Sequence, residues 1–147
     1  MAGRVRWYGD RVAAELQRSA AEGVQRAGSL LQTRARLLAN RPARRIRRKR
    51  TRATTAGPKG SQYTEYVGSR PGQPPALRTG FGRRSITMQF LRQRLVARVG
   101  PAANAVYMAY LELGTARIKP RPWLKPAIQQ SLPAIRALLA NAMRRTR

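Results

Sequence analysis

Apolar residues in the first third of the chain recur every three or four positions, the spacing that places side chains on one side of an α-helix. This pattern predicts a long helix over residues 8–40, in which Gly23 and Gly28 each weaken the helix by about 1 kcal/mol relative to alanine. The apolar stripe must be covered, either by a sheet or by a neighbouring subunit. Its members are Val12, Leu16, Ala20, Val24, Ala27, Leu31, Ala35 and Leu38.

Apolar residues at every second position of two short runs predict a β-hairpin over residues 86–99. Residues 92–94 are the expected turn, although they lack the usual Gly or Asn, and Gly100 with Pro101 ends the second strand. The alternating apolar positions are Ile86, Met88 and Phe90 on the first strand and Leu95, Ala97 and Val99 on the second.

Helical spacing returns in the last third of the chain. Asn104 is expected to cap a short helix that runs to Leu113 and ends at Gly114. A C-terminal amphipathic helix follows, and Pro133 within it should kink or restart it. The apolar positions of this helix are Ile128, Leu132, Ile135, Leu138, Leu139 and Met143.

The segment between these elements, residues 41–75, has a different character. Like charges repel, and Pro and Gly break regular structure, so we expect a long basic arm or loop with a short strand at residues 63–67. One domain overall is expected: the helix of residues 1–40, the arm of residues 41–75, and an α+β core of residues 76–147. The cations of the arm are Arg41, Arg44, Arg45, Arg47, Arg48, Lys49, Arg50 and Arg52.

Composition adds an extreme charge balance to this picture. The chain has 147 residues, with 31 Lys and Arg against 5 Asp and Glu and a formal net charge of +26. Such a chain attracts nucleic acid, acidic protein surfaces or anionic lipid. It has no Cys, its N-terminus lacks the apolar core of a signal peptide, and no stretch approaches ~18 apolar residues. A soluble protein made in the cytoplasm, without a membrane partner, is the expectation.

Few residues offer catalytic chemistry. His and Cys are absent, and three of the five acids, Asp10, Glu15 and Glu22, fit the polar side of the first predicted helix. Only Glu65 and Glu112 remain, too few for a two-metal site. We therefore expect no enzymatic activity, no cofactor and no metal. Glu112 lies among apolar neighbours, where a carboxylate is usually paired; the candidate partners are Arg78, Arg117 and Arg121.

The basic cluster of residues 41–52 has three interpretations. Arg side chains bind phosphate oxygens in bidentate fashion, which favours nucleic acid. The cluster also suits a solvated arm, or one that lies against an acidic patch of a partner protein. No recognition helix, zinc motif or aromatic RNA-binding platform accompanies it, so sequence-specific DNA reading is not expected.

Three stretches of the chain resemble a known family. Residues 69–80 and 83–86 resemble the S-x-P-G-x-P-P…T-G-x-L-x-x-S-I stretch of long-tailed phage neck proteins. Residues 99–101 with 107–115 resemble the V-G-P…Y-A-x-x-x-E-x-G-T element, and residues 121–128 resemble R-P-F-L-x-P-A-L. Phe81 and Gly82 stand where x-Leu is usual, and Trp123 replaces the common Phe. The matching positions include Pro71, Gly72, Pro75, Thr79, Gly80, Glu112, Gly114, Thr115, Pro122, Trp123 and Pro126.

The resemblance covers residues 68–145, with the motifs in the right order and spacing. The family is also called tail-completion protein and includes relatives of minor tail protein Z. It implies an α+β fold in which a long N-terminal and a C-terminal helix pack on a small antiparallel β-sheet. It also implies a non-catalytic virion protein of the neck, in a homo-oligomeric ring that joins the DNA-filled head to the tail.

The resemblance leaves several points open. A ring of six is favoured and a ring of twelve is possible. Its neighbours would be a head-closure or adaptor protein and a tail terminator or tail tube, with nonspecific contact to packaged double-stranded DNA. The alternative is a basic, sequence-nonspecific nucleic-acid-binding protein.

Overall fold

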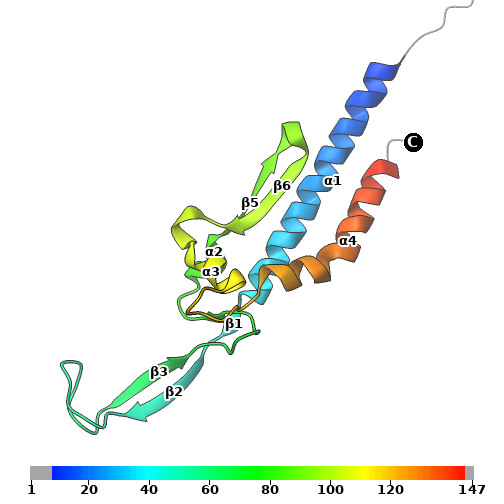
Figure 1. Ribbon diagram of the computed structural model, residues 1–147. Helices are drawn as coiled ribbons and strands as arrows, with labels where there is room; N and C mark the ends of the chain where they lie inside the picture. Colours follow the sequence, from blue (N-terminus) through cyan, green and yellow to red (C-terminus); the bar gives the residue numbers. More distant parts are fainter. Residues whose placement is uncertain (1–7, 145–147) are drawn as a thin grey trace, which may run out of the picture.

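The α+β fold is confirmed by the computed structural model, which describes residues 8–144. Its frame is a pair of long helices, α1 (Gly9–Leu38) and α4 (Leu124–Arg144), which lie side by side and run in opposite directions (Figure 1). On its other side α1 packs against a β-hairpin, β5–β6. A second hairpin, β2–β3, projects from the end of the molecule at which α1 stops. Within residues 8–144, none of the helices combines the length and the hydropathy of a membrane-spanning segment.

Helix α1 spans the predicted segment without interruption. Gly23 and Gly28 are both buried where other elements come closest to it. A Cβ atom at Gly23 would lie 2.9 Å from the Cβ of Ala142 in α4, and one at Gly28 would lie 2.7 Å from the Cβ of Ala97 in β6. The glycines therefore permit close packing on both sides of α1. Because α4 and β5–β6 cover much of its stripe, the length of α1 does not by itself require a neighbouring subunit.

We expect Gly28→Ala to lower the free energy of unfolding by about 1 kcal/mol, although the same change normally stabilises a helix. The gain in helix propensity is about 1 kcal/mol, whereas overpacking costs about 1–3 kcal/mol. Urea unfolding measures the difference. Adding Ala97→Gly should recover part of the loss, because it removes the opposing methyl group. A Gly28→Ala protein more stable than the parent would show that this contact is not close.

The predicted hairpin is confirmed as β5 (Ile86–Leu91) and β6 (Val96–Pro101), with Ile86 opposite Pro101 and Leu91 opposite Val96. Its turn is a 3₁₀ segment, Arg92–Arg94, and Leu95 adopts the positive φ of 51° that Gly or Asn would normally supply. Helix α1 is tied to the first strand by side-chain donors: Gln32 Nε2 and Arg36 Nη2 lie 3.0 and 2.7 Å from the carbonyl oxygen of Ile86.

The basic arm contains regular structure that the sequence did not predict. The expected strand at residues 63–67 is confirmed as β3 (Gln62–Val67), but the arginine-rich run itself forms a strand, β2 (Arg44–Lys49), paired with it in antiparallel fashion. Side chains alternate between the faces of a strand, so neighbouring cations point in opposite directions. At its base, β1 (Arg41–Pro42) pairs in parallel with β4 (Ala76–Leu77).

The short helix before Gly114 begins later than predicted. Asn104 does not cap it; it lies in a separate 3₁₀ turn, Ala103–Ala105, and α3 spans Tyr107–Leu113. The amide of Ala105 already bonds the carbonyl of Ala102 at 2.8 Å, which closes this turn ahead of the helix. Helix α4 continues through Pro133 and changes direction along its length (Figure 1), as a proline in a helix predicts. A five-residue helix, α2 (Phe81–Ser85), leads into β5.

Candidate functional site

Trp123 lies at the centre of the core. Its side chain is 1% exposed, and its indole Nε1 donates a hydrogen bond of 3.0 Å to the carbonyl oxygen of Met108 in α3. It is flanked by Pro122 and Pro126, both partly buried. Trp123 therefore holds α3 to the start of α4. The buried residues packed with it are Ala35, Ala39, Ile86, Ala105, Met108 and Ala127.

Glu112 caps α4. Its Oε2 atom accepts hydrogen bonds from the amides of Trp123 at 2.6 Å and Leu124 at 2.8 Å, and Oε1 accepts one from Lys125 at 2.8 Å. The first amides of a helix have no partner within the helix, so the carboxylate supplies acceptors that they would otherwise lack. Its negative charge is also attracted to the positive end of the helix dipole, and Glu112 therefore stabilises the start of α4.

The expected ion pair of Glu112 with Arg78, Arg117 or Arg121 is wrong. Within residues 8–144 the ion pairs are Arg26 with Glu22 and Arg48 with Glu65. The carboxylate of Glu112 is instead occupied by backbone amides, which approach it because Trp123 fixes the start of α4 beside α3.

The loop after α3 depends on Gly114 and Thr115. Gly114 has a φ of 79°, and a Cβ atom there would lie 3.0 Å from the carbonyl oxygen of Ile118. The chain therefore leaves the helix sharply at a position that favours glycine. The hydroxyl of Thr115 accepts hydrogen bonds from the amides of Arg117 at 3.3 Å and Ile118 at 3.1 Å, which closes the loop.

The Pro71–Gly72 pair forms a tight turn. The amide of Gln73 bonds the carbonyl of Arg70 at 3.1 Å, and Gly72 has a φ of 78°, the combination typical of a type II turn with proline first. The amide of Gly72 also bonds the carbonyl of Pro120 at 2.9 Å. This bond joins the turn to the loop that precedes Trp123.

The Thr79–Gly80 pair begins α2. The hydroxyl of Thr79 accepts a hydrogen bond from the amide of Phe81 at 3.3 Å, and Gly80 has a φ of 76°. Pro75 and Gly80 are both buried. Pro75, Thr79 and Gly80 line one hollow together with Met108 and Leu111 of α3, and hydrogen bonds join Gly72 to Pro120 and Glu112 to Trp123. We call the predicted motif residues, taken together, the motif cluster. Its members are Pro71, Gly72, Pro75, Thr79, Gly80, Glu112, Gly114, Thr115, Pro122, Trp123 and Pro126.

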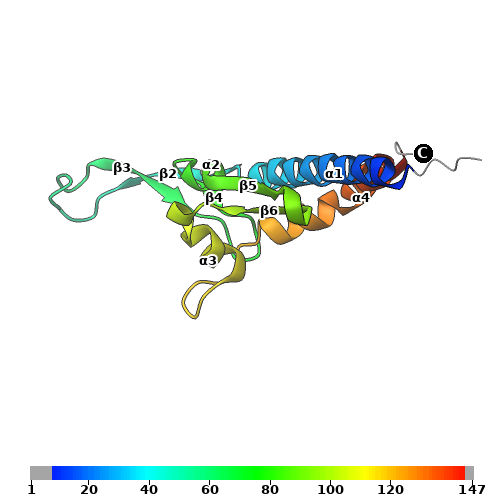
Figure 2. The same cartoon turned by 90° about the horizontal axis from the view of Figure 1, so that it is seen from above.

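An exposed apolar surface surrounds α3 and was not predicted. Leu113 is 80% exposed and Tyr110 is 52% exposed. The rings of Phe81 and Tyr107 stack on each other at 6.5 Å between centroids. Figure 2 shows α3 and the loop after it standing away from the layer formed by α1, β5 and β6. We call this the α3 surface; its residues are Phe81, Val106, Tyr107, Tyr110, Leu113 and Ile118.

The predicted cations of the arm divide among three places. Arg41, at the base, donates to Gln73 Oε1 at 2.8 Å. Arg50 and Arg52 belong to the loop at the tip, where Arg50 donates to Thr54 Oγ1 at 3.2 Å and its guanidinium lies 5.0 Å from the ring of Tyr63. The remaining cations occupy β2 and are exposed to solvent: Arg44, Arg45, Arg47, Arg48 and Lys49.

Acidic side chains are scattered over the structure. Asp10, Glu15 and Glu22 are exposed on α1, in agreement with their predicted place on its polar side. In the part of the chain that the structure describes, no three acidic side chains gather where they could hold a metal ion.

Comparisons of the chain with models of protein families, with curated proteins and with solved structures gave no match. Because no relative indicates a function, the proposals below rest on three features of the chain itself: the motif cluster, the α3 surface and the basic hairpin.

Proposed function

We propose that this chain is a structural subunit of the neck of a long-tailed bacteriophage, in a ring that joins the DNA-filled head to the tail. The observation that carries the proposal is the motif cluster. The stretches that resemble neck proteins are separated along the chain, yet hydrogen bonds of Arg121 to Leu111, Glu112 to Trp123 and Trp123 to Met108 join two of them. Gly72 of the first stretch bonds Pro120, the residue just before the last stretch. If the resemblance of each stretch to a neck protein were accidental, there would be no reason for the stretches to contact one another in the fold.

The α3 surface supports assembly. Solvent-exposed apolar groups gathered on one protruding element are typical of an interaction site, and Leu113 and Tyr110 are the most exposed of them. A closed ring needs two different surfaces on each subunit, one for each neighbour. In this proposal the α3 surface is one of them. The ring has six copies, or alternatively twelve, and lies between a head-closure or adaptor protein and the tail terminator or tail tube. Its role is structural, in the virion, without catalysis or cofactor.

Assembly is expected to weaken in the double variant Tyr110→Ser, Leu113→Ser. Both side chains are exposed in the monomer, so the free energy of unfolding should change by less than about 0.5 kcal/mol. Light scattering at high protein concentration measures the mass of the particles. The matched control, Leu37→Ser with Val96→Ser, removes two exposed apolar side chains that belong neither to the α3 surface nor to the apolar stripe of α1, and should leave assembly intact. Equal assembly by the parent and the Tyr110/Leu113 variant would exclude the α3 surface as the contact.

The second candidate function is a basic protein that binds nucleic acid without sequence preference. The specific observation in its favour is the row of exposed cations on β2. A symmetrical ring in electron micrographs supports the neck subunit, whereas strongly salt-dependent binding of free nucleic acid by a monomer supports the second candidate. The two are compatible, because the neck of a phage encloses the exit path of the genome.

A further inference from the structure

We propose that one face of the β2–β3 hairpin binds the sugar–phosphate backbone of nucleic acid without reading its sequence. We call it the cationic face; it consists of Arg45, Arg47, Lys49, Gln62, Thr64 and Tyr66. The inference rests on the second candidate function, which it deepens by naming the face and the chemical group that this face binds, and it does not depend on the ring.

The register of the hairpin separates its cations. Directly opposed residues in an antiparallel pair lie on the same face. Arg45 therefore shares a face with Tyr66, Arg47 with Thr64, and Lys49 with Gln62, and all six residues are exposed. This face carries three cations and no acid.

The opposite face has another composition. Arg44 is opposite Val67, Ile46 is opposite Glu65, and Arg48 is opposite Tyr63. Glu65 forms an ion pair with Arg48, and Ile46 and Val67 are partly buried. The one acid of the hairpin therefore offsets charge on this face alone. The positive charge of the cationic face remains uncompensated.

The cations of this face are regularly spaced and partly pre-oriented. Alternate residues of a strand lie about 6.5–7 Å apart, which sets Arg45, Arg47 and Lys49 in a row. The guanidinium of Arg45 lies 5.6 Å from the centre of the Tyr66 ring, and that of Arg78, which follows β4, lies 5.5 Å from it. Such contacts hold guanidinium groups in place at low entropic cost. Arg78 adds a fourth cation beside the row.

The composition favours nucleic acid over an acidic protein surface. Protein–protein interfaces have an apolar centre depleted of charge, whereas protein–DNA interfaces are more polar and strongly positive. On the cationic face Tyr66 is the one residue with a large apolar group, and the other five are polar or charged. A row of Arg and Lys without groups placed to read bases suits phosphate oxygens.

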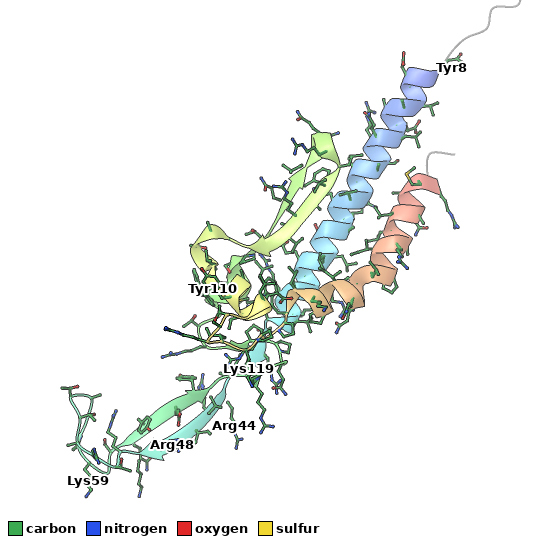
Figure 3. The ribbon with its side chains drawn as sticks, in the orientation of Figure 1. Tyr8, Arg44, Arg48, Lys59, Tyr110 and Lys119 are labelled. Atoms are coloured by element: carbon green, nitrogen blue, oxygen red, sulfur yellow. The ribbon has the colours of Figure 1, made fainter. Side chains whose placement is uncertain are left out.

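The hairpin is also placed to reach a long ligand. Figure 3 shows Arg44 near the base of the hairpin, Arg48 farther along its strand, and Lys59 at the tip, well away from the helical body. The tip is closed by backbone hydrogen bonds of Arg50 to Ser61 and of Gly60 to Arg50, both 2.9 Å. A cationic face that projects in this way can lie along the phosphates of a long nucleic acid without entering a groove.

The test compares two variants of the full chain with equal loss of charge. One is Arg45→Gln, Arg47→Gln, Lys49→Gln on the cationic face. The other is Arg92→Gln, Arg94→Gln, Arg98→Gln, which removes three exposed cations from the β5–β6 hairpin. Binding of each to two short DNA duplexes of unrelated sequence, and to polyglutamate, is titrated over a series of salt concentrations. Circular dichroism checks that both variants are folded.

The cationic-face variant should bind at least tenfold more weakly near physiological salt, equally for both duplexes. The slope of log affinity against log salt should fall by about 0.9 for each phosphate that the variant no longer neutralises, hence by about 2–3 in total. The β5–β6 variant should bind less than threefold more weakly. Arg47→Gln alone, the mildest change, should lower the slope by about 0.9.

Three results would overturn the inference. Equal weakening in the two triple variants would mean diffuse attraction by net charge. Unequal weakening on the two duplexes would mean that bases are read. Loss of binding to polyglutamate, with binding to the duplexes unchanged, would assign the face to an acidic protein surface.

Discussion

Trp123→Ala is expected to lower the free energy of unfolding by about 3–5 kcal/mol, the range for truncating a buried aromatic side chain. The indole is 1% exposed and fills the junction of α1, α3 and α4. Its removal leaves a cavity and also leaves the carbonyl of Met108 without the Nε1 donor. Chemical denaturation followed by circular dichroism measures the change in stability.

The control for this variant is Trp123→Phe. A phenyl ring fills much of the pocket but cannot donate the hydrogen bond to Met108, so a decrease of about 1–2 kcal/mol is expected. If Trp123→Ala unfolds at the same denaturant concentration as the parent, the core does not depend on the indole.

Glu112→Ala is expected to cost about 2–3 kcal/mol, because three amides at the start of α4 lose their acceptor. The effect should appear as fraying of the first turn of α4, near Leu124 and Lys125. Hydrogen exchange of these amides, measured together with the free energy of unfolding, locates it.

Two further variants separate capping from charge. Glu112→Gln keeps one carbonyl acceptor and should lower stability about half as much. Glu15→Ala removes an exposed acid of α1 from the same very basic chain, and should change the free energy of unfolding by less than about 0.5 kcal/mol. Equal decreases for Glu15→Ala and Glu112→Ala would show that net charge, not the cap, is responsible.

The two long helices and the β5–β6 hairpin are predictable because their periodicity is local. Gly23 and Gly28 are weak points of α1 when the sequence alone is considered, since spacing along one helix carries no information on what packs against it. Only the structure brings Ala142 and Ala97 to them. The strand at Arg44–Lys49 could not be predicted from the sequence for a related reason. Repulsion within a charge run argues against regular structure, but alternation of the side chains and pairing with Gln62–Val67 relieve it.

The candidate site is predictable in part. The isolation of Glu112 among apolar residues correctly indicates that it is paired, yet its partners are backbone amides, which carry no signal in the sequence. The α3 surface does have a signal. Val106, Tyr110 and Leu113 recur at helical spacing on the side of α3 away from Met108, so the helix is apolar on more than one side.

The measurement that tests the central proposal most directly is cryo-electron microscopy of virions of a phage that encodes this chain. We expect a closed ring at the junction of head and tail, with six copies favoured over twelve. α1, α4 and the β5–β6 hairpin should fit the density of each subunit as one rigid body. A junction built entirely of other chains, together with light scattering that finds only monomer at high concentration, would contradict the assignment.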